Sequence, residues 1–195
     1  MMERMSGQDD TGRDDVDRDR IQRVIGFWRE AGYAKWFNGG AEFDAQCREH
    51  LGELHMVVAR RECDHWMAAP EGAAALLVLL DQIPRNIFRG SGHAFATDPL
   101  ALLHARHAVD TGLDRDVAAD LRPFVYMPFE HSESLDDQHR AVELFAALGD
   151  DTYLGYAKAH LEVIERFGRF PHRNRALGRI STADEQAWLD AGGGF

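Results

Sequence analysis

The chain reads Pro70-Glu71-Gly72-Ala73-Ala74-Ala75-Leu76-Leu77-Val78-Leu79-Leu80 around its longest apolar run, which extends from Ala73 to Leu80. Pro70 suits the first turn of a helix, where its missing N–H costs nothing. A helix that is apolar on every side has no face to present to water. The run is far shorter than the roughly 20 residues that cross a membrane. It therefore predicts a buried central helix rather than a membrane anchor.

Apolar residues recur at helical spacing on both sides of this run. The spacing predicts one helix from Ile21 to Trp28, ending before Gly32, and a longer one from Phe43 to Val58. Further helices, bounded by capping residues, glycine or proline, are expected from Asp98 to Gly112, before Pro128, from Ser134 to Gly149, from Thr152 to Gly168, and after Thr182. No run alternates for long enough to predict a strand. The short connections favour an all-α fold of antiparallel helix pairs.

Charge and cysteine content narrow the functional classes. The chain has 22 basic and 33 acidic residues, a net charge of −11, which disfavours nucleic acids and anionic membranes as partners. Residues 1–18 lack a secretory signal and predict a disordered polar tail ahead of a single all-helical domain at 19–195. Cys47 and Cys63 match no zinc or thioredoxin spacing. We therefore expect a cytoplasmic protein, and the sequence assigns it no metal-ligating residues and no cofactor, although it leaves open whether a metal is bound.

Three polar segments adjoin strongly apolar residues. The first, at 79–90, reads Leu-Leu-Asp-Gln-Ile-Pro-Arg-Asn-Ile-Phe-Arg-Gly. Pro84 predicts a kink or a break, and continued winding past it places Asp81, Arg85 and Arg89 on one helix face. Either these groups line a pocket, or Asp81 and Arg85 form an ordinary ion pair on a solvated face.

The second segment, at 126–134, reads Tyr-Met-Pro-Phe-Glu-His-Ser-Glu-Ser and precedes a helix start, which favours anions. A capping turn with a hydrogen-bonded histidine is equally consistent with it. The third segment, at 166–179, holds five arginines and one histidine without a carboxylate. These arginines need counter-charge from acidic side chains elsewhere in the chain or from an anionic ligand.

Together with Lys35-Trp36-Phe37, these segments resemble, in order, the signature blocks of the bacterial domain-of-unknown-function family 924. The resemblance covers nearly all of the chain after Ile21, although most members have Phe where Ile83 stands here. It implies an all-helical, tetratricopeptide-like fold, a right-handed array of helix pairs. It implies no activity and supplies no catalytic residues.

We expect the three segments to converge, because apolar neighbours draw each one inward and buried polar groups must be paired. Arginine there would grip a small anionic molecule, and histidine would support acid–base or hydrolytic chemistry. The expected catalytic residues are Glu130, His131 and His172. The expected ligand-binding residues are Asp81, Arg85, Asn86, Arg89, Glu133, Arg173 and Asn174.

Two other interpretations stay open. A tetratricopeptide-like groove would bind a peptide or a partner protein, with Arg169, Arg173 and Arg179 reading an acidic tail. Alternatively, the polar residues form a buried ion-pair network that fixes the helix packing. No P-loop, dinucleotide fingerprint or nucleophile elbow occurs, so the sequence leaves open whether the protein is an enzyme.

Overall fold

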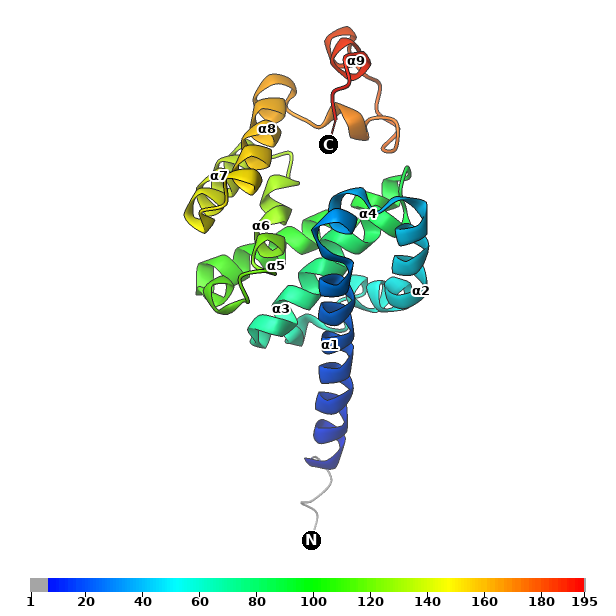
Figure 1. Cartoon of the computed structure of the whole chain (residues 1–195), viewed down its shortest axis with the longest axis vertical. Helices are drawn as coiled ribbons and strands as arrows, with labels where there is room; N and C mark the ends of the chain where they lie inside the picture. The colour runs from blue at the N-terminus through cyan, green and yellow to red at the C-terminus, as the bar shows by residue number, and fades with distance from the viewer. Residues whose placement is uncertain (1–6, 195) are drawn as a thin grey trace.

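The computed structural model describes residues 7–194, and every regular element in that range is a helix (Figure 1). This confirms the expected all-α fold class. The α-helices are α1 (Gly7–Asn38), α2 (Gly40–Ala59), α3 (Pro70–Leu77), α4 (Ile83–Ile87), α5 (Asp98–Thr111), α6 (Pro123–Glu130), α7 (Leu135–Leu148), α8 (Asp151–Phe167) and α9 (Ala183–Asp190). Shorter elements are η1 (Asp64–Ala68), η2 (Val78–Gln82), η3 (Gly92–Phe95), η4 (Leu113–Asp116) and η5 (Pro171–Arg173).

The centre of the fold is α3 together with η2. Every side chain from Ala73 to Leu80 is at most 1% exposed, which confirms the expected buried helix. α1 and α2 cover one side of this centre, α5 and α6 cover the other, and α7 and α8 pack against α6 farther out (Figure 1). Gly149 ends α7 in the left-handed conformation at φ 79°, so α8 folds back and packs along α7.

The N-terminal region differs from the sequence expectation. α1 is continuous from Gly7, so the described part of the expected tail at 1–18 is helical, while residues 1–6 lie outside the described range. The helix has a reason to form, because Asp17 is 8% exposed and accepts a hydrogen bond from His65 in η1. Gly32, at φ 68°, interrupts α1 where the first helix was expected to end. Within residues 7–194, no helix combines the length and apolar character that a membrane span requires.

Pro84 widens the helix without ending it. The preceding residues wind as a π-helix, η2, and α4 continues directly from them. Pro84 has no N–H for the carbonyl of Leu80, and the hydroxyl of Thr97 donates to that carbonyl instead at 2.6 Å. Neighbouring carbonyls are also satisfied by side chains, since His55 Nδ1 lies 2.8 Å from Leu79 O. π-Segments of this kind often occur at functional sites.

Thr97→Val is expected to lower the free energy of unfolding by about 1 kcal/mol, because it removes the hydroxyl that donates to the buried carbonyl of Leu80. Urea denaturation checks this value. Thr111→Val is the matched control, because the Thr111 hydroxyl donates to His107 O at an exposed helix end. Equal stability of the two variants would contradict the capping role of Thr97.

Candidate functional site

Asp81 lies on η2, where the widened turn directs its carboxylate toward α6. The side chain is fully buried. His131, at the C-terminal end of α6, places Nδ1 2.8 Å from Asp81 Oδ1, and Gln82 Nε2 donates to Asp81 Oδ2 at 2.6 Å. Arg85, one turn later, lies 3.3 Å from the same carboxylate. The first and second polar segments therefore meet directly.

The charge states of this pair follow from its surroundings. Burial alone raises the pKa of a carboxyl, but Arg85 and His131 outweigh it and hold the pKa of Asp81 well below its usual range. Burial, followed by the charge of Arg85, lowers the pKa of His131, which keeps the imidazole neutral near pH 7. A neutral ring that donates from Nδ1 to Asp81 carries its lone pair on Nε2. His131 Nε2 has no partner among the described residues.

The third segment joins the cluster through Asp98. Arg85 donates two hydrogen bonds to this carboxylate, at 2.9 and 3.0 Å. Arg173 Nη1 reaches the same carboxylate at 3.3 Å. The Arg173 guanidinium also lies 4.7 Å from the ring centroid of Phe95 and 4.4 Å from that of Phe170. The expected convergence of all three segments is therefore present.

Arg173 is the least compensated cation of the cluster. It is 6% exposed, and its Nε has no hydrogen-bond partner in the described part of the chain. Its one carboxylate contact is shared with Arg85, which holds Asp98 more closely. Burial, and then the charge of Arg85, lowers the pKa of Arg173 to about 10. This corner of the cluster thus has an excess of positive charge.

Two further histidines, His160 and His172, lie next to the Asp81 cluster. His160 on α8 places Nδ1 2.8 Å from Glu130 Oε1 and 2.9 Å from the carbonyl of Tyr156. The rings of His131 and His160 are 6.1 Å apart. Burial, and then the charge of Arg173, lowers the pKa of His172 to about 3, with smaller contributions from the other histidines and Arg85. The ring of Phe170 lies 5.5 Å from that of His160 and 5.6 Å from that of His172, so His172 lies on the same side of the cluster as His131 and Glu130.

Some predicted residues are engaged elsewhere. Arg89 turns toward α2 and donates to both oxygens of Asp44 at 2.6 and 2.8 Å. Asn86 bonds the carbonyl of Gln82 at 3.0 Å and accepts from Arg89 at 3.2 Å. Neither contact involves the cluster around Asp81. Arg89 pairs with Asp44 because this acidic partner on α2 is available to it, and Arg85 is the arginine of this segment that joins the Asp81 cluster.

Glu133 and Asn174 hold the C-terminal segment in place. Glu133 accepts two hydrogen bonds from Arg179, at 2.8 and 2.9 Å, and one from the backbone of Phe170. Asn174 donates to Ser181 at 3.1 Å and to Glu185 at 3.3 Å. These contacts position Arg173 and His172, while the buried Asn174 Oδ1 has no hydrogen-bond partner in the described part of the chain.

Sequence reasoning missed Asp98 and His160 as site residues. The Asp98-Pro99 pair was interpreted only as a helix start, and Asp98 is in fact the first residue of α5. His160 lies within the helix expected from Thr152 to Gly168, in which the sequence analysis named no site residue. The sequence could have indicated a role for His160, because a histidine on the buried face of a helix needs a polar partner. That partner is Glu130, which no sequence spacing could identify.

His172 makes stability depend on pH. Its pKa of about 3 lies below the value near 6.5 of an unfolded chain, so between these values the unfolded state binds more protons. The stability contributed by neutral His172 is complete above about pH 6.5 and falls as the pH drops, by up to about 1.4 kcal/mol per unit. Urea denaturation between pH 4.5 and 8 is expected to show a flatter profile for His172→Asn than for the wild type. His93→Asn, at an exposed position, is the control, and equal slopes in all three proteins would contradict the assignment.

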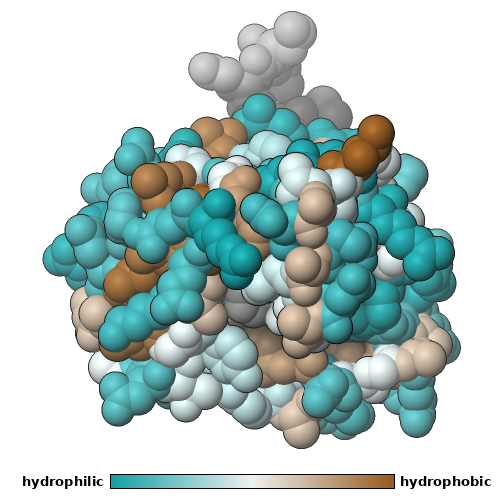
Figure 2. Space-filling model, turned by 90° about the horizontal axis from the view of Figure 1, so that it is seen from above, coloured by the Kyte–Doolittle hydropathy of each residue, from teal (hydrophilic) through white to brown (hydrophobic). Residues whose placement is uncertain are grey.

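The surface at the end of the molecule where α9 lies is mostly hydrophilic, with separate hydrophobic patches (Figure 2). Two surface pockets lie away from the Asp81 cluster, one lined by the first half of α1 and one between α5 and α7. Within residues 7–194, no group of three or more His, Cys, Asp or Glu side chains is placed to hold a metal ion.

Comparison with known proteins agrees with the sequence resemblance. A solved structure from Agrobacterium tumefaciens, described as the protein of unknown function ATU0120, is 44% identical and superposes with a TM-score of 0.84. The match covers 88% of this chain and 97% of that one. No curated protein matches significantly. The sequence model of the family described as bacterial protein of unknown function (DUF924) matches residues 24–193, and the chain therefore belongs to that family.

Proposed function

We propose that the cluster around Asp81 binds a small anionic molecule, a carboxylate or a phosphate, and carries out acid–base or hydrolytic chemistry on it. The observation that carries the proposal is the buried Arg173 guanidinium, whose one carboxylate contact, at 3.3 Å, is shared with Arg85. A buried cation without its own counter-ion is costly, and an anionic ligand removes that cost.

The proposed anion-binding group, the Arg173 guanidinium, is preorganised. Phe95 and Phe170 contact the Arg173 guanidinium with their rings, which restricts its orientation before any ligand arrives. A guanidinium held in this way can present two parallel N–H groups to a carboxylate or a phosphate. Glu133 contributes indirectly by accepting from the backbone N–H of Phe170, and Asn174 contributes by donating to the side chain of Ser181.

His131 is the proposed general base. Asp81 orients the ring through Nδ1, so Nε2 can take a proton from water or from the bound molecule. In a hydrolytic reaction, the oxygen of that water bonds the electrophilic atom of the substrate. The leaving group then departs with the proton returned by His131. The role proposed for Glu130 is to position His160, and neutral His172 is a hydrogen-bonding group rather than an acid at pH 7.

Arg173→Gln is expected to weaken ligand binding at least 10-fold, because it removes the charge that attracts the anion. A thermal-shift screen of small carboxylates and phosphates with the wild type identifies a ligand, since binding to the native state raises its melting temperature. Titration calorimetry then compares the variants. Arg175→Gln is the matched control, because Arg175 is exposed in the same segment. A ligand that binds Arg173→Gln as tightly as the wild type would overturn the proposal.

A structural ion-pair network is the second candidate, and the number of two-pronged pairs favours it. Arg85 with Asp98, Arg179 with Glu133, and Arg169 with Glu185 all show this geometry. If the cluster is only structural, Arg173→Gln changes the free energy of unfolding and no anion in the screen raises the melting temperature of the wild type.

We further propose a cytoplasmic location. Cys47 and Cys63 are both buried free thiols, which suits a reducing compartment. Fractionation of cells with an antibody against the chain tests this placement.

A further inference from the structure

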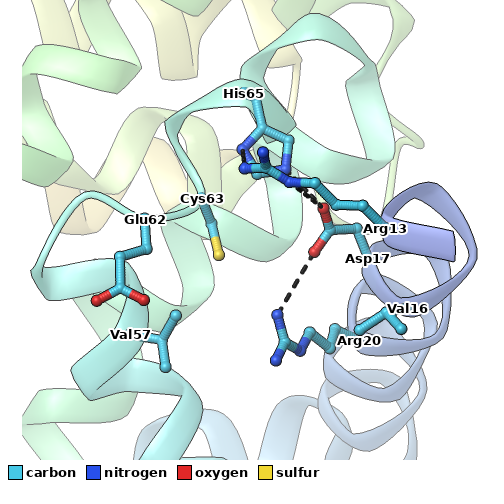
Figure 3. A pocket seen from close by; sticks show the side chains of 8 residues that line it. All are labelled: Arg13, Val16, Asp17, Arg20, Val57, Glu62, Cys63 and His65. Atoms are coloured by element: carbon cyan, nitrogen blue, oxygen red, sulfur yellow. Dashed lines mark hydrogen bonds and ion pairs between the residues drawn. The ribbon is translucent and has the colours of Figure 1, made fainter. Parts of the chain in front are cut away.

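A surface pocket lies between the first half of α1 and the connection from α2 to η1 (Figure 3). Its volume is about 590 Å³, enough for a small organic molecule. The α1 wall carries two arginines and Val16. The opposite wall carries the apolar groups Val57 and Cys63. The lining residues are Arg13, Val16, Asp17, Arg20, Val57, Glu62, Cys63 and His65.

The α1 wall lies outside the region that the family's sequence model matches. That model begins at residue 24, whereas Arg13, Val16, Asp17 and Arg20 all precede it. The opposite wall, from Val57 to His65, lies inside the matched region. The first half of α1 therefore contributes half of this pocket from outside the region that the family's sequence model matches.

Asp17 holds this wall against the body of the protein. It is 8% exposed and accepts a hydrogen bond from His65 Nε2 at 2.6 Å (Figure 3). The hydrogen bond with His65 and nearby positive charges outweigh the effect of burial and lower the pKa of Asp17, so the carboxylate stays ionised. The pocket is thus built by a fixed contact between α1 and η1.

The two arginines of the wall lack a close counter-ion of their own. Arg20 Nη1 lies 3.6 Å from Asp17 Oδ1, and Arg13 Nε lies 3.8 Å from Asp17 Oδ2. Both distances exceed the 2.7–2.9 Å typical of charge-assisted hydrogen bonds. Asp17 already accepts from His65, so one engaged carboxylate faces two guanidinium groups. On the other wall, the charge of Glu62 is compensated by Arg60 at 2.6 Å.

We propose that this pocket binds a phosphomonoester, with the phosphate between Arg13 and Arg20 and the organic group against Val16, Val57 and Cys63. A phosphate has three terminal oxygens and can accept from two guanidinium groups that approach from different directions. A planar carboxylate satisfies only one of them in a two-pronged geometry. Burial raises the pKa of the Cys63 thiol, which therefore stays neutral and acts as a small apolar group.

This proposal does not rest on the function proposed for the Asp81 cluster. The two sites share no residue, and they are built by different elements. The test is made with the full chain by titration calorimetry, using phenyl phosphate as the probe. Inorganic phosphate measures the anion alone, and benzoate presents a similar ring with a carboxylate. Each titration is repeated in Arg173→Gln, so that binding at the Asp81 cluster is separated from binding at this pocket.

In Arg173→Gln, where the Asp81 cluster no longer attracts the anion, phenyl phosphate is expected to bind at least 10-fold more tightly than inorganic phosphate or benzoate. Arg20→Gln is expected to weaken that binding at least 10-fold. Arg18→Gln, on the same helix but outside the pocket, is the matched control, because Arg18 pairs with Asp15 in solvent. The proposal is overturned if phenyl phosphate does not bind Arg173→Gln, if benzoate binds Arg173→Gln equally well, or if the folded Arg20→Gln variant binds phenyl phosphate as tightly as the control. Circular dichroism of each variant verifies folding.

Discussion

Asp81→Ala is expected to lower the free energy of unfolding by about 3 kcal/mol, because it removes the buried carboxylate that three side chains share. Removing one partner of a buried ion pair typically costs 3–5 kcal/mol. The lower end applies here, since Asp98 continues to compensate Arg85 at 2.9 and 3.0 Å. The remaining cost comes from His131 and Gln82, whose buried donors lose their acceptor.

Urea denaturation of Asp81→Ala measures this loss, and Asp110→Ala, at an exposed position on α5, is the control. Asp81→Asn separates stability from chemistry. It preserves the shape of the side chain, but its amide can donate to His131 Nδ1 and so select the wrong tautomer. If Asp81→Ala is as stable as the Asp110→Ala control, the carboxylate does not organise this cluster.

Leu80→Ala is expected to lower the free energy of unfolding by about 2–5 kcal/mol. Leu80 is 0% exposed and lies on η2 at the centre of the fold. Truncation removes buried apolar surface and leaves a cavity that a close-packed interior only partly fills. The effect also reaches the candidate site, because the next residue is Asp81.

Leu103→Ala is the matched control for Leu80→Ala, since Leu103 lies on α5 with 51% of its surface exposed. Its loss of stability is expected to stay within about 0.5 kcal/mol. Thermal and urea unfolding of both variants test the comparison. A Leu80→Ala protein within 1 kcal/mol of the wild type would contradict the central position of this helix.

The sequence alone predicted the helix boundaries wherever the interaction that sets them joins residues close together in the chain. The capping pair of Thr182 and Glu185, and the left-handed glycines at 112, 149 and 168, appear where helix boundaries were expected. The central run from Ala73 to Leu80 was equally readable, because a segment without a polar face can only be buried.

The sequence predicted only part of the candidate site. Burial pressure correctly indicated that the segments containing Asp81, His131 and Arg173 converge. The choice of partner was not available from sequence, since Arg89 and Arg85 look alike on one helix face. Arg89 pairs with Asp44 on α2, and Arg85 pairs with Asp98 on α5. Such choices depend on which carboxylate lies within a few ångströms after folding.

The amino-acid sequence by itself determined the helical class, the buried centre and the residue types that need partners, because these follow from local periodicity and from the cost of burying polar groups. Tertiary structure alone decided which acidic group meets each arginine, how Thr97 replaces the hydrogen bond that Pro84 cannot make, and that Asp17 anchors the polar first half of α1 on His65. Each of these contacts joins residues distant along the chain. Their geometry exists only once the helices are packed.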